Sequence, residues 1–319
     1  MPAPVLPSLP HYSPAPQTME NLEWAPLPVI DFSKAHTPKG LAELAPEDIS
    51  NGVRDQIEQY NCTFHSHRHA KLDLSRDAVH RAVNDAELQE HPRALEPFLP
   101  ELRAFTEHNH FSIVHPLLRM LAQGMALPDE TFVKMHDFDR ASDTSARVMK
   151  YYPRSNEEET QTNNVWMKGH TDIGTITILW SQPVSGLQIM CPDGKWRWVR
   201  HIDNALTVNI GDSMEFLSGG YYKATIHRVR QPPADQAGYL RLGVFYFGMA
   251  DDDALLKPRL ESPVLQRVGV APRFDLEHAP SMKQYRTGLT SAYGVSKLQK
   301  KDDGTEVEVI HGVVVKHFN

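Results

Sequence analysis

The chain has little cysteine and no long apolar run. Its 319 residues include only two cysteines, Cys62 and Cys191, which argues against a disulfide framework and favours a reduced, cytoplasmic setting. No apolar run approaches the roughly 18 residues that indicate a membrane-spanning helix. The first 28 residues lack a basic segment followed by an apolar one, so no signal peptide is expected.

An excess of positive charge is also missing. The chain has 33 lysines and arginines against 40 aspartates and glutamates, and its formal net charge is −7. This balance argues against nucleic acid as the main partner, and the absent apolar run argues against a membrane. The 40% of apolar residues is enough for a sizeable core.

The distribution of proline, glycine and β-branched residues predicts three regions. Residues 1–26, rich in proline, predict an extended arm, and residues 27–145 predict a largely helical region. Residues 146–319 predict a β core followed by a helix and a tail, because short β-branched runs alternate there with Gly/Pro turns. The expected helices cover 47–60, 75–90, 97–126, 129–138 and 273–290, and a late strand lies within 307–315. The fold class predicted is mainly β with flanking helices.

Three residues have the chemistry of an open metal site. His170 and Asp172 are two positions apart, and alternate residues of a strand point to the same side. His227 lies in a second strand-like run, Ala224–Val229. Two histidines and one carboxylate on one face leave coordination positions open, which suits an iron(II) that takes up O₂ and an organic ligand. A structural zinc site would be closed and often rich in thiolates.

The spacing alone has an alternative explanation. With 17 histidines and 40 acidic residues, a His-x-Asp or His-x-Glu pair should occur by chance about once or twice. It does occur again, at His201 and Asp203. The β-branched run Gly174–Trp180 follows only the first pair, which favours His170 and Asp172 as the pair on a sheet.

Arg241 is the fourth candidate residue. It lies in Tyr239–Phe247, and strand alternation puts Arg241, Gly243, Phe245 and Phe247 on one face. After the turn that follows His227, we expect an antiparallel hairpin to bring this face beside His227. A buried guanidinium needs an anion, and its planar shape suits a carboxylate. A structural ion pair is the alternative explanation.

These residues belong to a longer series of motifs, and together the motifs resemble those of the iron(II)/2-oxoglutarate-dependent dioxygenases, in the branch that includes isopenicillin N synthase. The motifs span about residues 27–250 and comprise Leu27–Phe32, Leu121–Pro128, Lys150–Pro153, Gly169–Asp172, Gly186–Gln188, Asn209–Glu215, Ser218–Gly220 and His227–Val229.

The resemblance implies a double-stranded β-helix, or jelly roll, and assigns roles to individual residues. Iron(II) would be bound by His170, Asp172 and His227. Arg241 would hold the distal carboxylate of 2-oxoglutarate, and Tyr152 would donate its hydroxyl to the same cosubstrate. Phe245 and Phe247 are candidates for the substrate pocket, with core packing as the alternative.

Three positions depart from the family pattern. Gly243 stands where the family has a serine two residues after the arginine, so one hydrogen bond to the carboxylate is missing. Lys150 stands in place of an asparagine before the two tyrosines. The expected strand of the N-terminal region is replaced by a polar run, His65–His69, interpreted as an exposed loop. The N-terminal region would then be divergent or shortened, with an incomplete sheet edge.

The resemblance implies an oxidoreductase that uses Fe(II), 2-oxoglutarate and O₂. It would hydroxylate, desaturate or cyclise a small organic molecule, in secondary metabolism by the habit of the family. Two alternatives stay open. Gly243 leaves room for an oxidase of the isopenicillin N synthase type, which uses no 2-oxoglutarate. The altered N-terminal region leaves room for a binding protein that keeps the jelly roll without activity.

Overall fold

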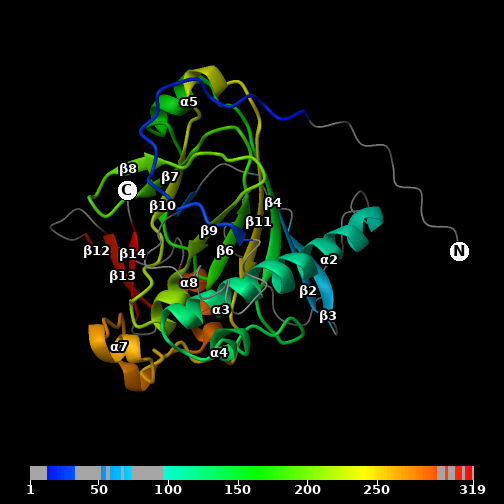
Figure 1. Cartoon of the computed structure of the whole chain (residues 1–319). Helices are drawn as coiled ribbons and strands as arrows, with labels where there is room; N and C mark the ends of the chain where they lie inside the picture. Colours follow the sequence, from blue (N-terminus) through cyan, green and yellow to red (C-terminus); the bar gives the residue numbers. More distant parts are fainter. Residues whose placement is uncertain are drawn as a thin grey trace, which may run out of the picture.

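Two antiparallel sheets form the body of the molecule in the computed structural model (Figure 1). The structure describes residues 13–32, 52–54, 58–65, 68–73, 96–292, 299–300, 306–310 and 313–317. In spatial order, the five-stranded sheet consists of β1 (Gly52–Arg54), β5 (Val165–His170), β10 (His227–Arg230), β7 (Leu187–Met190) and β8 (Trp196–Trp198). The six-stranded sheet consists of β3 (Arg68–Asp73), β2 (Glu58–His65), β4 (Ser145–Tyr151), β11 (Arg241–Gly248), β6 (Ile176–Trp180) and β9 (Leu206–Ile210).

The order of the strands confirms the predicted mainly-β, jelly-roll fold. From β4 to β11 the chain crosses between the sheets at every step except the hairpin of β7 and β8, so β4, β6, β9 and β11 lie in one sheet while β5, β7, β8 and β10 lie in the other. Neighbouring strands within each of these groups run antiparallel. This interleaving brings strands that are far apart in the sequence onto the two facing walls of one interior.

One prediction about strand pairing is wrong. β10 and β11 do not form a hairpin, because β10 pairs with β5 and β7 while β11 pairs with β4 and β6. The connection between them contains the 3₁₀ helix η4 (Ala234–Gln236) and crosses from one sheet to the other. Arg241 therefore approaches β10 across the interior of the sandwich. The alternation of β11 predicts the face on which Arg241 lies, but it does not determine the partner strand.

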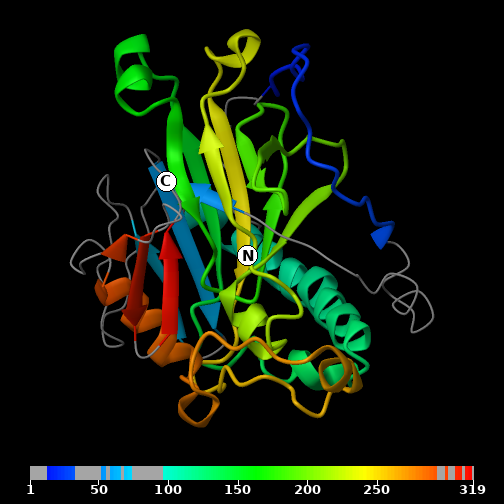
Figure 2. The same ribbon diagram turned by 90° about the vertical axis from the view of Figure 1, so that its left-hand side faces the viewer.

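A long helical segment covers the outer face of the six-stranded sheet (Figures 1 and 2). It begins with the 3₁₀ helix η2 (Glu96–Phe98) and continues through α2 (Leu99–Glu107), the π-helix η3 (His108–Val114) and α3 (His115–Gly124). The helix predicted over 97–126 is thus confirmed. Pro116 lies in the first turn of α3, where its missing N–H is tolerated, and the wider π turn precedes it. The short helix α4 (Glu130–Val133) follows.

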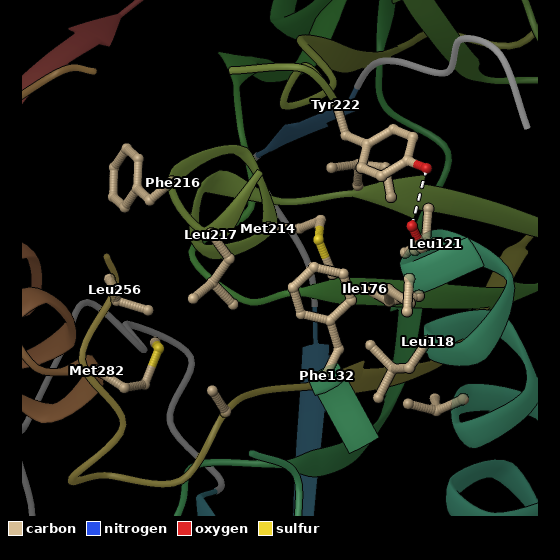
Figure 3. Packing of buried hydrophobic residues seen from close by; sticks show 14 of the residues in the cluster. Leu118, Leu121, Phe132, Ile176, Met214, Phe216, Leu217, Tyr222, Leu256 and Met282 are labelled. Carbon is tan, nitrogen blue, oxygen red and sulfur yellow. Dashed lines mark hydrogen bonds between the residues drawn. The ribbon is translucent and has the colours of Figure 1, made fainter. Parts of the chain in front are cut away.

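The main hydrophobic core lies between this helical segment and the six-stranded sheet. Leu118, Leu121 and Phe132 meet Ile176 from β6 and Tyr246 from β11, and all five are buried. The hydroxyl of Tyr222 donates a hydrogen bond of 3.0 Å to the carbonyl oxygen of Leu121 (Figure 3). Apolar residues recur along the helical segment with helical period because one of its faces packs against the six-stranded sheet.

The N-terminal region differs from its predicted helical structure. The helix expected over 47–60 is wrong, because β1 and the first part of β2 lie there and pair with β5 and β4. His65 ends β2 and His69 lies in β3, so the exposed-loop interpretation of this run is wrong at those two positions; His67 lies outside the described residues. The hairpin of β2 and β3 extends the sheet edge that was expected to be incomplete. The local preference for helix over residues 47–60 is overridden by the pairing of β1 and β2 with neighbouring strands.

Two other N-terminal predictions have different outcomes. The helix expected over 75–90 lies outside the described residues. The described part of the proline-rich arm is extended and lies along β8: the backbone N–H of Ala25 donates to the carbonyl oxygen of Trp198 at 2.8 Å. The boundary proposed between residues 145 and 146 stays a prediction, although β2 shows that the sheet takes strands from both sides of it.

The remaining elements lie around the ends of the sheets. The helices are α5 (Asn156–Gln161), α6 (Asp212–Leu217), α7 (Pro263–Val268), the 3₁₀ helix η5 (Leu276–His278) and α8 (Met282–Ala292). A third sheet contains β12 (Gln299–Lys300), β13 (Glu306–Ile310) and β14 (Val313–His317). The late strand expected within 307–315 is thus a hairpin. Among the described helices, none combines the length and apolar character that a membrane crossing requires.

Replacement of Leu118 by alanine tests the core. Leu118 is fully buried in α3, and its truncation should lower the free energy of unfolding by about 2–5 kcal/mol through lost contacts and a residual cavity. Leu255→Ala is the matched control, because that leucine is 55% exposed and should change stability by less than about 0.5 kcal/mol. Chemical denaturation measures both, and equal losses in the two variants would contradict this placement of the core.

Candidate metal centre and cosubstrate pocket

The three predicted metal ligands lie together at one end of the sandwich. Their candidate ligand atoms are all within 4.8 Å of one another, and His170, Asp172 and His227 are the only such group among the described residues. His170 ends β5 and His227 begins β10, and the two residues are cross-strand partners. Asp172 follows β5 in a turn, so strand alternation alone does not place it. The distances from Asp172 are 3.6 Å to Nε2 of His170 and 3.9 Å to Nε2 of His227.

Backbone carbonyls orient both imidazole rings. Nδ1 of His227 lies 3.1 Å from the carbonyl oxygen of Thr225, and Nδ1 of His170 lies 3.3 Å from that of Lys168. A carbonyl only accepts, so each Nδ1 is the nitrogen that carries hydrogen. Nε2 of each ring is then free of hydrogen and faces Asp172, which is the arrangement that a metal ion requires of neutral histidine.

Two side chains from the six-stranded sheet hold the carboxylate of Asp172. The hydroxyl of Thr177 donates to Oδ2 at 2.7 Å, and the amide of Asn209 donates to the same oxygen at 2.9 Å. Thr177 and Asn209 are cross-strand partners on β6 and β9. Sequence reasoning noticed the motif around Asn209 without assigning this role to it. The two donors leave Oδ1 for an ion.

Burial and charge set the protonation of the ligands. Burial by itself would raise the pKa of Asp172, but interaction with His170, charge interaction with His227 and the hydrogen bond from Thr177 hold it well below its ordinary value. Burial, together with the neighbouring His170, lowers the pKa of His227 well below its ordinary value. At neutral pH the site therefore offers an ionised carboxylate and an unprotonated His227, which is the form that binds a cation.

Helix α6 clamps the turn that carries Asp172. The N–H of Asp212 donates to the carbonyl oxygen of Asp172 at 2.8 Å, and the N–H of Ser213 donates to that of Gly174 at 3.1 Å. A Cβ atom at Gly211 would overlap the carbonyl oxygen of Gly174 and lie 2.9 Å from that of Asp172. Glycine at position 211 is thus needed for the close approach of the two segments.

A buried arginine lies on the inner face of β11. Arg241 is 4% exposed, its Nε donates to the carbonyl oxygen of Val184 at 3.3 Å, and its guanidinium lies 5.2 Å from the ring centre of Tyr151. Its Nη1 has no hydrogen-bond partner among the described residues, and it forms no ion pair with any of their carboxylates. Burial lowers its pKa, against the opposing charge interaction and hydrogen bond of Tyr151. A buried cation with an unused donor fits a carboxylate ligand.

The tyrosine beside Arg241 is Tyr151, and the assignment to Tyr152 requires correction. Tyr151 is the cross-strand partner of Arg241 and is 1% exposed. Tyr152 is 43% exposed, and the ammonium group of Lys150 lies 4.8 Å from the centre of its ring. Tyr152 is the first residue after β4, and the difference in burial places Tyr151 inside the sandwich and Tyr152 at the surface. Lys150, in place of the family asparagine, lies on the same side as Tyr152.

The two phenylalanines of β11 lie on its inner face. Their rings stack with centres 5.8 Å apart, and both side chains are partly exposed. Phe245 packs against a buried cluster that includes Met149, Trp166 and Val229. Phe247 is the cross-strand partner of Thr177, whose hydroxyl binds Asp172. Phe247 therefore lies at the level of the metal ligands, while Phe245 lies between them and Arg241.

Comparison with known proteins agrees with this geometry. Residues 144–247 match the family model described as the 2OG-Fe(II) oxygenase superfamily. A 2-oxoglutarate-dependent dioxygenase of Gibberella zeae is 30% identical over 209 residues, which cover 65% of this chain and 61% of that protein. A second one, from Amanita muscaria, is 34% identical over 142 residues, covering 43% of this chain and 66% of that protein. The aligned part of the chain thus spans about three fifths to two thirds of these relatives.

Solved structures share the fold. A full-length protein of Neurospora crassa, solved in complex with alpha-KG, superposes with a TM-score of 0.60 at 18% identity, covering 88% of this chain and 74% of that one. A 2OG-Fe(II) oxygenase family protein of Caulobacter crescentus gives 0.53 at 18% identity and covers 80% of both chains. The matched family, the relatives and the shared jelly roll agree, and the chain belongs to the 2OG-Fe(II) oxygenase superfamily.

A methyl group at Gly211 tests the clamp on the metal-binding turn. Gly211→Ala should displace the turn of Asp172, lower the free energy of unfolding by about 1–3 kcal/mol and weaken iron(II) binding at least about ten-fold. Gly238→Ala is the matched control, since a Cβ there meets nothing within 4 Å. Metal titration and denaturation measure both variants. Unchanged iron affinity in Gly211→Ala would show that the turn does not depend on this contact.

Proposed function

We propose that the protein is an iron(II)- and 2-oxoglutarate-dependent oxygenase that oxidises a small organic molecule. The observation that supports this most directly is one interior that contains both an open three-ligand metal site and a buried arginine without a carboxylate partner among the described residues. 2-Oxoglutarate has a 2-oxo acid group that chelates a metal and a second carboxylate at the other end. Its two ends match these two features.

Each part of the site has a separate task in this proposal. His170, Asp172 and His227 would hold iron(II), which supplies the capacity to activate O₂ when it is bound. Arg241 would neutralise the distal carboxylate, and Tyr151 would keep the guanidinium in place through its hydrogen bond and its ring. Phe247, beside the donors to Asp172, is positioned to contact the substrate. Thr177 and Asn209 would keep the carboxylate of Asp172 in the orientation that the ion needs.

The relatives and Cys191 bear on the substrate class, the metabolic role and the cellular location. The relatives include fungal proteins named 2-oxoglutarate-dependent dioxygenases, and a further structure of the Neurospora crassa protein is a complex with alpha-KG and thymine. For this chain we propose a small-molecule substrate, a place in secondary metabolism and a cytoplasmic location, which the unpaired, buried Cys191 favours. The reaction would be hydroxylation, desaturation or ring closure.

Gly243 supports one alternative. Without the family serine, Arg241 has one fewer companion for the cosubstrate carboxylate, and an oxidase could use the arginine for a carboxylate of its substrate. In that case 2-oxoglutarate would not bind at the metal. The presence of all three ligands in binding geometry opposes the other alternative, a non-catalytic binding protein.

Anaerobic titration of the iron(II)-loaded protein with 2-oxoglutarate tests the proposal. Chelation by the 2-oxo acid end should produce a weak visible metal-to-ligand charge-transfer band. His227→Ala should abolish iron binding, and Arg241→Leu should shift the titration to much higher 2-oxoglutarate concentrations. Bound iron without any band would favour the oxidase, and a wild-type protein that binds no iron would favour the non-catalytic alternative.

The same titration tests the tyrosine assignment. Tyr151→Phe removes a hydroxyl beside Arg241 and should weaken 2-oxoglutarate binding by about three- to ten-fold, the usual effect of one hydrogen bond. Tyr152→Phe is the matched control and should leave the affinity unchanged, because Tyr152 is 43% exposed and its ring lies against the ammonium group of Lys150. A loss confined to Tyr152→Phe would restore the assignment that the family resemblance implies.

A further inference from the structure

The cavity beside Arg241 has polar groups that the proposed function does not yet use. Ser181 follows β6 and His201 follows β8, and both line the same cavity as Arg241. His201 belongs to the second His-x-Asp pair of the sequence, which is not part of the metal-ligand group. This pair and Ser181 therefore need a separate explanation.

Ser181 lies beside the position where the family serine is missing. In the ladder of β6 and β11, the last pair is Trp180 with Val244. Ser181 is the next residue after Trp180, so the same register, continued by one step, would set it opposite Gly243. Thr177, on the same strand, points inward to Asp172. Ser181 follows the strand, and it lines the same cavity as Leu179 and Arg241, which puts it on the inward side as well. A hydroxyl is thus present on the neighbouring strand at the level of Gly243.

The ring of Phe245 prevents a hydroxyl from being placed at position 243 itself. A Cβ atom at Gly243 would lie 2.5 Å from Cε2 and 2.9 Å from Cζ of Phe245. The ring is held by the buried cluster that includes Met149 and Trp166, and by its stacking on Phe247. A serine at 243 would require this ring to move. Gly243 and Phe245 are therefore one packing unit, in which the ring takes the space that a side chain at position 243 would need.

His201 is placed to orient the hydroxyl of Ser181. Nδ1 of His201 lies 2.9 Å from Oγ of Ser181, and Nε2 lies 3.1 Å from Oδ1 of Asp203. The side chain of His201 is 12% exposed, whereas that of Asp203 is 88% exposed. The carboxylate of Asp203 only accepts, so Nε2 carries the hydrogen of that contact. Nδ1 donates to Oγ when it carries a hydrogen as well, as in the imidazolium form, and the hydroxyl hydrogen of Ser181 is then left to point away from the ring. A carboxylate held by Arg241 is the strongest acceptor that this cavity can contain.

We propose that Ser181, oriented by His201, donates a hydrogen bond to the distal carboxylate of 2-oxoglutarate next to Arg241, in place of the absent serine at position 243. This inference rests on the proposed use of 2-oxoglutarate. It makes Ser181 a cosubstrate-binding residue and His201 a positioning residue. The neighbouring strand thereby restores the hydrogen bond that Gly243 removes.

A comparison of two 2-oxo acids distinguishes recognition of the distal carboxylate from a general effect on the metal site. 2-Oxoglutarate and 2-oxopentanoate chelate a metal in the same way, but 2-oxopentanoate has a methyl group in place of the distal carboxylate. In anaerobic titrations of the iron(II)-loaded protein, Ser181→Ala should weaken 2-oxoglutarate binding by about ten-fold and leave 2-oxopentanoate binding unchanged. Ser181→Thr, which keeps the hydroxyl, should recover most of the affinity. The double variant Ser181→Ala/His201→Leu should bind 2-oxoglutarate no more weakly than Ser181→Ala.

Each other result contradicts the proposal. Unchanged 2-oxoglutarate affinity in Ser181→Ala would show that the hydroxyl makes no contact with it. Equal weakening for both acids would show a structural role. If the wild-type protein bound the two acids equally, and Arg241→Leu altered neither, the proposed use of 2-oxoglutarate would fail together with this inference. Loss of the preference in Arg241→Leu but not in Ser181→Ala would overturn this inference alone.

A compensation experiment avoids dependence on one variant. In the Ser181→Ala background, Gly243→Ser with Phe245→Ala should restore at least part of the 2-oxoglutarate affinity, since it supplies a hydroxyl and removes the ring that excludes it. Phe245→Ala alone in the same background provides the space without the hydroxyl and should not restore it. If Ser181→Ala/Phe245→Ala bound 2-oxoglutarate equally well with and without Gly243→Ser, the hydroxyl at position 243 would not replace that of Ser181, and the proposal would be contradicted.

Discussion

The antiparallel register of β5 and β10 is the constraint on which the metal site depends. It makes His170 and His227 cross-strand partners and brings their ring centres to 5.0 Å. Both rings are anchored through Nδ1 to backbone carbonyls, so the strands determine the direction of the two Nε2 atoms. Asp172 joins them from a turn, which α6 holds by backbone hydrogen bonds. The ligands thus come from a rigid sheet and a clamped turn, which is what a preorganised site requires.

The second requirement is electrostatic. The interior contains the ionised carboxylate of Asp172 at one level and the guanidinium of Arg241 at another, with Phe245 between them. A buried charge is costly unless it is paired, and the two charges are compensated differently. Asp172 receives hydrogen bonds from Thr177 and Asn209 and faces the metal position. Arg241 keeps an unused donor, which makes a dicarboxylate that also chelates metal the complementary ligand.

β11 connects this interior to the helical layer. Its inner face carries Arg241, Gly243 and Phe245, while Tyr246 on its outer face lies in the main core, and its hydroxyl is 2.9 Å from Nδ1 of His110. Behind the metal turn, Nε2 of His136 lies 2.8 Å from the hydroxyl of Thr175. The helical layer is therefore more than a cover for apolar surface: His110 of the long helical segment supports β11, and His136, which follows α4, supports the segment next to Asp172.

The sequence alone determined the chemistry of the site, and only the tertiary structure decided its arrangement. Local spacing and strand-like sequence predicted His170, Asp172, His227 and Arg241 as site residues, because ligand type is a property of a short segment, although Asp172 lies in a turn that alternation does not place. The sheet to which each strand belongs depends on contacts between distant segments, so the predicted hairpin of β10 and β11 and the predicted helix over 47–60 were wrong. The same limit applied to Tyr152, where one step along the strand separates the pocket from the surface. That Ser181 lines the cavity of Arg241, and that the Phe245 ring fills the space next to Gly243, follows from packing between distant segments, for which the sequence has no local signal.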